Sequence, residues 1–329
     1  GAARPLMPRT HLSLAAQGVA LRPTVVIIES AADAWVIWEQ RTTVDPPSFL
    51  QAKRIDLDTW AVSNPFGIAG AVGSIEYPTA IYNSTRNEVA VVYQYVDLTT
   101  TIRLARIDAA TRATLSDTAI SGADCLEPHL AFSADRQEYL AVWSAHTGEV
   151  EFLEAYVEAR RVDAATGAPI GNAFPLEDPE STARFEAFPR AVYDQTLASW
   201  AVLWRSAASA SDISFSMRLA RFAAAPEGDT FPVLEHATIS TASAGDGGHG
   251  LAFAPLSEQF MLVWEESAAK TAGLVTRRLT AGGFFLDDPT AFPGSGARQR
   301  SPQLTYNANR HEFFTVWRDE RTLKPQLYA

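Results

Sequence analysis

The sequence predicts an all-β fold, a six-bladed β-propeller whose blades are four-stranded antiparallel sheets. Three observations predict it. One pattern recurs six times along the 329 residues, and every copy holds two strand-length apolar runs. No stretch carries a sustained apolar period of about 3.6 residues, which a series of helices would require. The period of the repeat, roughly 50–60 residues, is that of a propeller blade.

Each copy opens with proline and a short apolar strand, which is followed by a polar turn and a second apolar strand ending in Trp or Tyr. The copies open at Pro23, Pro78, Pro128, Pro189, His249 and Pro302, with histidine in place of proline in the fifth. Five copies hold two aromatic residues eleven positions apart: Tyr82 and Tyr93, Phe132 and Trp143, Tyr193 and Trp204, Phe253 and Trp264, and Tyr306 and Trp317. The first copy keeps this spacing with Ile27 and Trp38. The series predicts six equivalent hairpins.

A third strand follows in most copies and carries a basic residue at a regular place. These residues are Arg54, Arg106, Arg161, Arg221 and Arg278. A weaker fourth strand follows, for example at residues 173–176 and 237–240. Because the arginines and the strand-two aromatics recur in nearly every copy, we expect them to serve pairing and packing between strands and blades, not one binding site.

The repeat predicts a single domain that spans residues 1–329. The blades cover approximately residues 22–76, 77–126, 127–187, 188–247, 248–300, and 301–329 together with 1–21. The sixth copy stops within its third strand, and residues 11–15 have the composition of a fourth strand. We therefore expect the N-terminal strand to complete the last blade and close the ring, which would remove exposed strand edges. Length alone would suggest two domains.

Two segments carry a resemblance to a known group of proteins. They are NSTRNEVAVVY at residues 83–93 and NANRHEFFTVW at residues 307–317, the latter followed by RDER. They resemble the blades of bacterial secreted and surface β-propeller repeat proteins, whose units centre on a "YLVVW" strand. The resemblance covers nearly the whole chain as a repeat pattern, and it implies an extracytoplasmic propeller of unassigned or binding function. Neither the Trp-Asp dipeptide of WD40 units nor the aspartate box of sialidases is present.

Composition excludes several partners. Asp and Glu number 38 against 27 Lys and Arg, a net charge of −11, which argues against nucleic acid because binding to phosphate requires clustered cations. No polybasic cluster suits an anionic membrane, and no apolar run reaches the roughly 20 residues of a membrane-spanning helix. The single cysteine, Cys125, excludes an internal disulfide and a Cys-based metal site. We predict no cofactor and no metal, and an extracellular or periplasmic location, although residues 1–17 show no signal peptide.

The candidate binding residues lie at two places in the repeat, next to the opening proline and just after the strand-two aromatic. In propellers these places face the central channel on one side of the ring, an analogy from fold alone. The candidates are His129, Arg190, His249, Gln303, Glu39, Glu265, Arg205 and Arg318. We expect the first three to converge and bind an anionic group through the arginine fork. The alternative is pairing with neighbouring carboxylates such as Glu127. An arginine between two histidines opposes a metal ion.

The interpretation we favour from sequence is a non-enzymatic binding module that recognises a glycan or a protein through the central face, with no catalytic residue. The first alternative is a glycosidase-like hydrolase or lyase that would use channel-mouth carboxylates such as Glu39 and Glu265. Pairs of carboxylates catalyse glycoside hydrolysis in many enzymes. The second alternative is a structural subunit of a larger extracellular assembly. The sequence makes no prediction of the oligomeric state.

Overall fold

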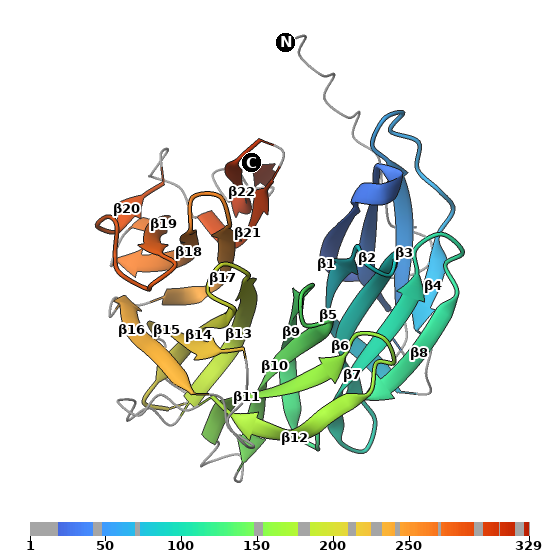
Figure 1. The fold of residues 1–329 in the computed structure, drawn as a ribbon, viewed down its shortest axis with the longest axis horizontal. Coiled ribbons are helices and arrows are strands. Elements are labelled where there is room, and N and C mark those ends of the chain that lie inside the picture. Colours follow the sequence, from blue (N-terminus) through green and yellow to red (C-terminus); the bar gives the residue numbers. More distant parts are fainter. Residues whose placement is uncertain are drawn as a thin grey trace. The chain divides into compact units, whose positions relative to one another are not determined.

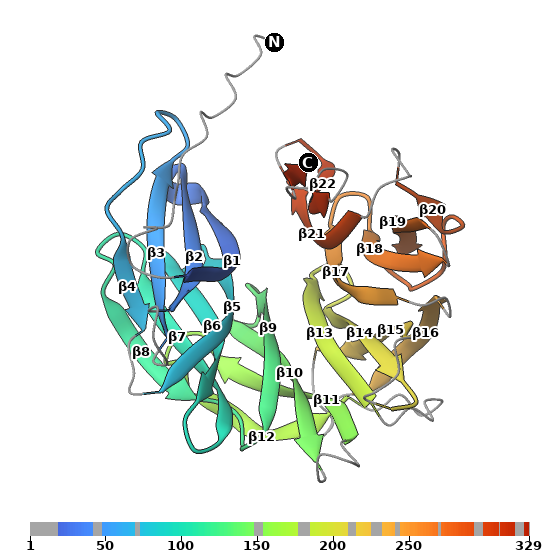
Figure 2. The same cartoon turned by 180° about the vertical axis from the view of Figure 1, so that it is seen from behind.

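The computed structural model describes residues 19–41, 48–69, 73–147, 154–176, 185–209, 215–224, 232–240, 244–268, 271–292, 299–308, 310–319 and 326–328. Within these ranges the regular structure is β-strand except for one short 3₁₀ turn, η2 (Glu29–Ala31). The strands form antiparallel sheets of neighbours in sequence (Figures 1 and 2). The prediction of an all-β chain of four-stranded antiparallel sheets is confirmed.

The sheets follow one another along the chain. The first contains β1 (Val19–Ile28), β2 (Asp33–Arg41), β3 (Ser48–Asp56) and β4 (Phe66–Ala69). The second contains β5 (Ser74–Asn83), β6 (Glu88–Val96), β7 (Thr100–Asp108) and β8 (Thr114–Ala119). The third contains β9 (Cys125–Ser133), β10 (Glu138–Thr147), β11 (Glu154–Asp163) and β12 (Pro169–Pro175).

The fourth sheet contains β13 (Phe185–Asp194), β14 (Ser199–Ala207), β15 (Ser216–Ala223) and β16 (Val233–Ser240). The fifth contains β17 (Ala244–Ala254), β18 (Gln259–Ala268), β19 (Thr271–Thr280) and β20 (Thr290–Ala291). The sixth contains β21 (Gln299–Asn307), β22 (Glu312–Asp319) and β23 (Gln326–Tyr328). One parallel bridge between Ala155 and Phe185 joins the third sheet to the fourth.

The chain divides into two compact units, and the division passes through the third sheet. One unit contains Gly1–Leu130, Gln137–Tyr139 and Arg161–Ile170, and the other contains Ala131–Arg136, Leu140–Arg160 and Gly171–Ala329. The strand expected at residues 11–15 lies outside the described residues. The number of blades, the closure of the ring and the single domain stay predictions.

The strand-two aromatics of the second, fourth and fifth sheets are buried between neighbouring sheets, as predicted, whereas Trp38 packs with residues of its own sheet. Tyr93 packs with residues of the first and second sheets, Trp204 with the third and fourth, and Trp264 with the fourth and fifth. All three have at most 1% of their surface exposed. Full burial of a large aromatic side chain stabilises a fold by a few kcal/mol, so this position explains why the repeat keeps an aromatic residue.

The strand-three arginines pair within their own sheets, which confirms the structural role predicted for them. Arg54 Nε donates to Asp33 at 2.7 Å, Arg106 Nε to Glu88 at 2.9 Å, and Arg161 Nε to Glu138 at 2.8 Å. The acidic partner is in each case the first residue of the second strand. In the fourth sheet Ser199 takes this place and accepts a hydrogen bond from Arg221 at 3.1 Å, and in the fifth Arg278 pairs with Asp287.

In the second and third sheets, an aspartate closes the turn between the third and fourth strands. Asp108 Oδ1 accepts hydrogen bonds from the backbone N–H and the hydroxyl of Thr111 at 2.6 and 2.8 Å, and Asp163 holds Thr166 in the same way. These hydrogen bonds stabilise the charged form, so the pKa of both aspartates lies below its usual range. The residue after the threonine is left-handed in both turns, Arg112 with φ 64° and Gly167 with φ 75°.

The buried hydroxyl of Tyr139 should make the stability of the protein depend on pH in the alkaline range. This hydroxyl accepts a hydrogen bond from the Asn83 amide at 3.0 Å, and burial raises its pKa to about 12. Because an unfolded tyrosine titrates near pH 10, the unfolded state loses its proton first as pH rises. We expect stability to fall between about pH 10 and 12, by roughly 2–3 kcal/mol from this residue. Urea unfolding across this range should show a shallower fall for Tyr139→Phe, and an unchanged fall would contradict the assignment.

Candidate functional site

A β-bulge interrupts the first strand of the sheets at the repeated proline. The register with the second strand shifts between Leu21 and Thr24 in the first sheet, and equivalent shifts occur in the second, fourth and sixth sheets. The residue before the proline has a left-handed backbone at Arg22, Tyr77, Glu127, Phe188 and Ser301, with φ between 47 and 57°. A bulge bends its strand and redirects a side chain. We call this end of each sheet, with the residues just after the strand-two aromatic, the bulge edge.

The residues expected to converge lie on three different strands. His129 is on β9 in the first compact unit, whereas Arg190 is on β13 and His249 on β17 in the second. Arg190 Nη1 donates to the Pro189 carbonyl at 2.9 Å, and only 1% of the His249 surface is exposed. The convergence of these three residues stays a prediction.

The other candidates divide by burial. Glu39, Arg205 and Glu265 are buried, whereas Gln303 and Arg318 are exposed on the sixth sheet. At the equivalent places, Gln94 Oε1 accepts the backbone N–H of Glu127 at 3.4 Å, and Ser144 Oγ accepts that of Phe188 at 3.2 Å. The position after the aromatic therefore helps to hold the bulge of the next sheet. In the first five sheets the side chain at this position is buried, whereas an open channel face was expected from the sequence.

Two arginines and two glutamates form a network at the bulge edge of the first and second sheets. Arg22 Nη1 donates to Glu39 Oε2 at 2.6 Å and to Glu76 Oε2 at 3.4 Å. Arg41 Nη2 donates to Glu76 Oε1 at 2.8 Å, and its Nε donates to Glu39 Oε1. Each arginine therefore bridges both carboxylates. Sequence reasoning selected Glu39 and missed the other three.

This arginine pair, Arg22 and Arg41, keeps part of its surface in solvent. The side chains of Arg22 and Arg41 are 34 and 42% exposed, whereas the Glu39 side chain has no exposed surface. Within the described part of the chain, Arg22 hydrogen-bonds through Nη1 alone, and Arg41 Nη1 has no acceptor. Each guanidinium therefore retains N–H groups that can fork onto a carboxylate or a sulfate.

The Arg22 guanidinium also stacks on an aromatic ring, with its carbon 3.8 Å from the centre of the Tyr77 ring. Burial alone would lower the pKa of Arg22. The hydrogen bond to Glu39 and the nearby acidic groups outweigh burial, and the pKa lies above its ordinary value. Arg22 is therefore a permanent cation whose plane is fixed by Glu39 on one side and Tyr77 on another, which prepares it for a planar anion.

The carboxylates of this network are placed to orient the arginines, not to act on a substrate. Both Glu39 oxygens contact arginine nitrogens, and the side chain is sealed from solvent. Glu265, the second proposed catalytic carboxylate, is 2% exposed and lies 3.8 Å from Arg300 Nε. A general acid must reach the oxygen that it protonates. Glu39 and Glu265, the carboxylates expected to serve a hydrolase or lyase, are therefore too buried to contact a substrate.

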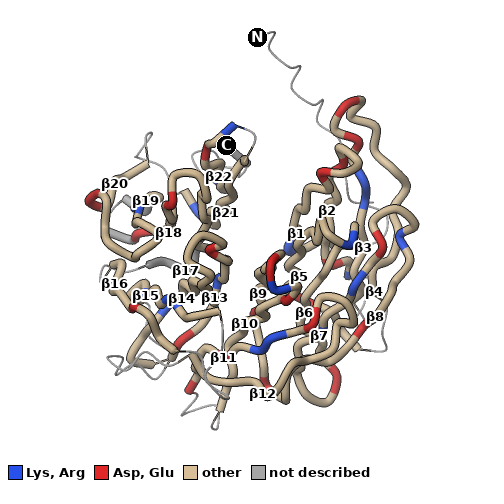
Figure 3. Tube along the Cα trace, in the orientation of Figure 1, with Lys and Arg blue, Asp and Glu red and all other residues tan. Residues whose placement is uncertain are grey.

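The bulge edge of the fourth to sixth sheets is also rich in arginine. The Arg205 guanidinium lies over the rings of Phe188 and Phe215, 4.7 and 5.3 Å from their centres. Arg300 and Arg318 are cross-strand partners on β21 and β22. Basic and acidic positions are interspersed along the rest of the chain trace (Figure 3).

Other kinds of site are poorly supported. No group of three or more His, Cys, Asp or Glu side chains that could hold a metal ion occurs among the described residues. No helix in these residues is long and apolar enough to cross a membrane. Cys125 is buried, with Sγ 3.3 Å from the Ala123 carbonyl.

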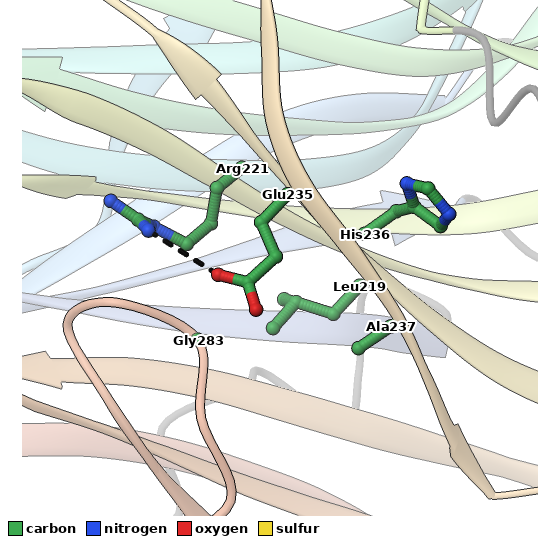
Figure 4. A pocket seen from close by; sticks show the side chains of 6 residues that line it. All are labelled: Leu219, Arg221, Glu235, His236, Ala237 and Gly283. Carbon is green, nitrogen blue, oxygen red and sulfur yellow. Dashed lines mark ion pairs between the residues drawn. The ribbon is translucent and has the colours of Figure 1, made fainter.

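A small depression lies beside β15 and β16, where the turn carrying Gly283 approaches Glu235 (Figure 4). Glu235 pairs with Arg221 at 3.5 Å, and a Cβ at Gly283 would collide with the Glu235 carboxylate. The space is about 150 Å³ including open solvent, below the roughly 300–1,000 Å³ of ligand pockets. We interpret it as a packing feature between neighbouring sheets.

Comparison with known proteins identifies the fold. No protein-family model and no curated protein matches the chain. Among solved structures, an ulvan lyase from a new family of polysaccharide lyases, bound to -[GlcA(1-4)Rha3S]-, has a TM-score of 0.64 at 9% identity over 93% of this chain and 78% of its own. The β-propeller domain of the trilobed protease from Pyrococcus furiosus has 0.53 at 9% identity over 96 and 82%. The endo-arabinase of Bacteroides thetaiotaomicron has 0.50 at 14% over 78 and 93%. At these identities the likeness shows the β-propeller fold alone.

These likenesses correct two predictions. A non-enzymatic binding module, and a chain that is not an enzyme, were expected because no catalytic motif occurs in the sequence. Both are contradicted, since the similar structures include a polysaccharide lyase and an endo-arabinase. The hydrolase or lyase alternative is favoured instead. A propeller site takes its residues from separate repeats, so a local motif is not required.

Proposed function

We propose that the protein is a glycan-cleaving enzyme, and specifically a lyase that acts on a polysaccharide containing uronic acid. The observation that carries the proposal is the arginine pair of Arg22 and Arg41, which is partly exposed and held by Glu39 and Glu76. The propeller fold, which an ulvan lyase shares, agrees with it.

Elimination from a uronic acid requires a cationic group beside the sugar carboxylate, and the arginine pair supplies one. A base removes the proton on C5 of the uronic acid, the bond from C4 to the glycosidic oxygen breaks, a C4–C5 double bond forms, and the leaving oxygen takes a proton. Negative charge develops on the sugar carboxylate as the C5 proton leaves. Arginine N–H groups aimed at that carboxylate stabilise this charge in the transition state. Glu39 would act as a positioning residue for Arg22.

We infer six blades in one ring that the N-terminal strand closes, in a protein that works outside the cytoplasm, as the resemblance to secreted propeller repeats implies. Ala80 and Tyr82 of the second sheet pack on the first sheet, whereas the equivalent Val25 and Ile27 of the first sheet are 58 and 47% exposed. A sixth blade that packs on this apolar surface would cover it and complete the ring.

Arg22→Gln tests the site. On a glucuronic acid polysaccharide, we expect kcat/KM to fall at least about 100-fold, close to 3 kcal/mol of transition-state stabilisation. Glu39→Gln should cause a smaller loss, because Arg22 and Tyr77 remain. Cleavage is measured by the ultraviolet absorbance of the new double bond, and folding by circular dichroism.

Arg112→Gln is the matched control. Arg112 is also partly buried and lies 4.9 Å from the centre of an aromatic ring, that of Phe66, but it belongs to the turn at the opposite end of the second sheet. Its substitution should leave the rate unchanged. Equal rates for Arg22→Gln and wild type, or no cleavage of any acidic polysaccharide by wild type, would overturn the proposal.

A further inference from the structure

The left-handed residue before each repeated proline is unexpected within a strand. L-residues avoid this conformation because Cβ approaches the backbone, and the left-handed place of a bulge is ordinarily taken by glycine. Five sheets nevertheless hold a side chain there, and Arg22, Tyr77 and Phe188 are large. Backbone strain of this kind persists where the surrounding structure imposes it, often beside functional sites.

A second left-handed position in the same repeat is explained by the geometry of a hairpin turn. It lies at the hairpin turn between first and second strands, at the opposite end of each sheet, for example at Asn87 and Gln137. Left-handed residues close such turns as a matter of geometry. The pre-proline residue closes no turn, so the turn explanation does not extend to it.

The side chains at this position meet one another and the arginines of the bulge edge. Arg22 and Tyr77 are pre-proline residues of neighbouring sheets, and they stack at 3.8 Å. Phe188, the equivalent of Tyr77 in the fourth sheet, receives the Arg205 guanidinium at 4.7 Å. In the first compact unit, the bulge therefore directs Tyr77 to the edge where the partly exposed arginine pair lies.

We propose that the pre-proline bulge position is where the sheets place ligand-contacting side chains, and that Tyr77 is a specificity-determining residue for the sugar whose anionic group binds Arg22. The inference rests on the proposed function for the class of ligand, an acidic sugar. Arg22 covers one face of the Tyr77 ring. The hydroxyl and the remaining ring edge can then hydrogen-bond to and pack on the sugar ring.

Three Tyr77 variants and one small probe test this inference. The probe is methyl β-glucuronide, which has no sugar linked at C4 and therefore cannot be cleaved by elimination. Its dissociation constant is measured by NMR titration. We expect Tyr77→Ala and Tyr77→Gly to weaken binding by the same factor, at least about fivefold, or roughly 1 kcal/mol. Tyr77→Phe should lose less, because it keeps the ring and the stacking with Arg22.

Thermal unfolding separates this contact from a structural role. Tyr77→Gly should melt at a higher temperature than Tyr77→Ala, because glycine tolerates the left-handed backbone. At the control position Arg112, which has the same backbone conformation, glycine should also exceed alanine in melting temperature, and neither substitution should alter binding of the glucuronide.

The results distinguish the role of Tyr77 in binding from the proposed lyase activity. Undiminished glucuronide binding by Tyr77→Gly, or a wild type that binds no glucuronide, overturns this inference. Weakened binding in the Tyr77 variants of a protein that cleaves no polysaccharide supports it and overturns the proposed lyase activity alone.

Discussion

Replacing Glu88 with alanine should lower the free energy of unfolding by about 3–5 kcal/mol, the cost of leaving one partner of a buried ion pair uncompensated. Glu88 and Arg106 are 8 and 7% exposed, and both Glu88 oxygens accept hydrogen bonds from the guanidinium. Without the carboxylate, Arg106 would be a buried cation between β6 and β7. Chemical denaturation in urea measures the change as a shift of the midpoint.

The same pairing in an exposed setting provides the control. Arg278 and Asp287 are 48 and 30% exposed, with 2.7 Å between their atoms. Because water screens and competes with exposed ion pairs, Asp287→Ala should cost less than about 1 kcal/mol. Similar losses in the two variants would show that burial does not set the strength of the strand-three arginine pairs.

Replacing Trp204 with alanine should also cost about 3–5 kcal/mol, through lost burial and the cavity left behind. The side chain is completely buried in the cluster that joins the third and fourth sheets. The loss would confirm that the repeated strand-two aromatic holds neighbouring sheets together. Calorimetry or urea unfolding measures it.

Phe284 is the matched exposed aromatic residue, with 72% of its surface in solvent. Phe284→Ala should change stability by no more than about 0.5 kcal/mol. A Trp204→Ala protein as stable as wild type would remove the packing explanation for the repeat.

Much of the fold was predictable because it repeats. The eleven-residue spacing of aromatic residues located the hairpins, for example Tyr82 to Tyr93 across β5 and β6. The regular arginines were predicted to be structural because a single site would not recur in every unit, and Arg106 with Glu88 confirms this. These features depend on local sequence, so one chain was enough to find them.

The candidate site was predictable only in part. Glu39 was assigned to an open face, yet its surroundings depend on Arg22 across the bulge and on Glu76 in the next sheet. The residue before a proline is expected to be extended, so the left-handed backbone conformation of Tyr77 could not be predicted from the sequence. The sequence therefore predicted ligand contacts for the residue after the proline, such as His129. The function was mispredicted because the absence of a local catalytic motif was taken as absence of catalysis.

The chemistry of the cleavage products tests the central claim most directly. Wild-type protein is incubated with a glucuronic acid polysaccharide, and the products are followed by ultraviolet absorbance and mass spectrometry. The account predicts fragments that absorb through a C4–C5 double bond and that are lighter by one water than hydrolysis products, formed at a rate that depends on Arg22. An intact polysaccharide, or fragments that have gained water and carry no double bond, would contradict it.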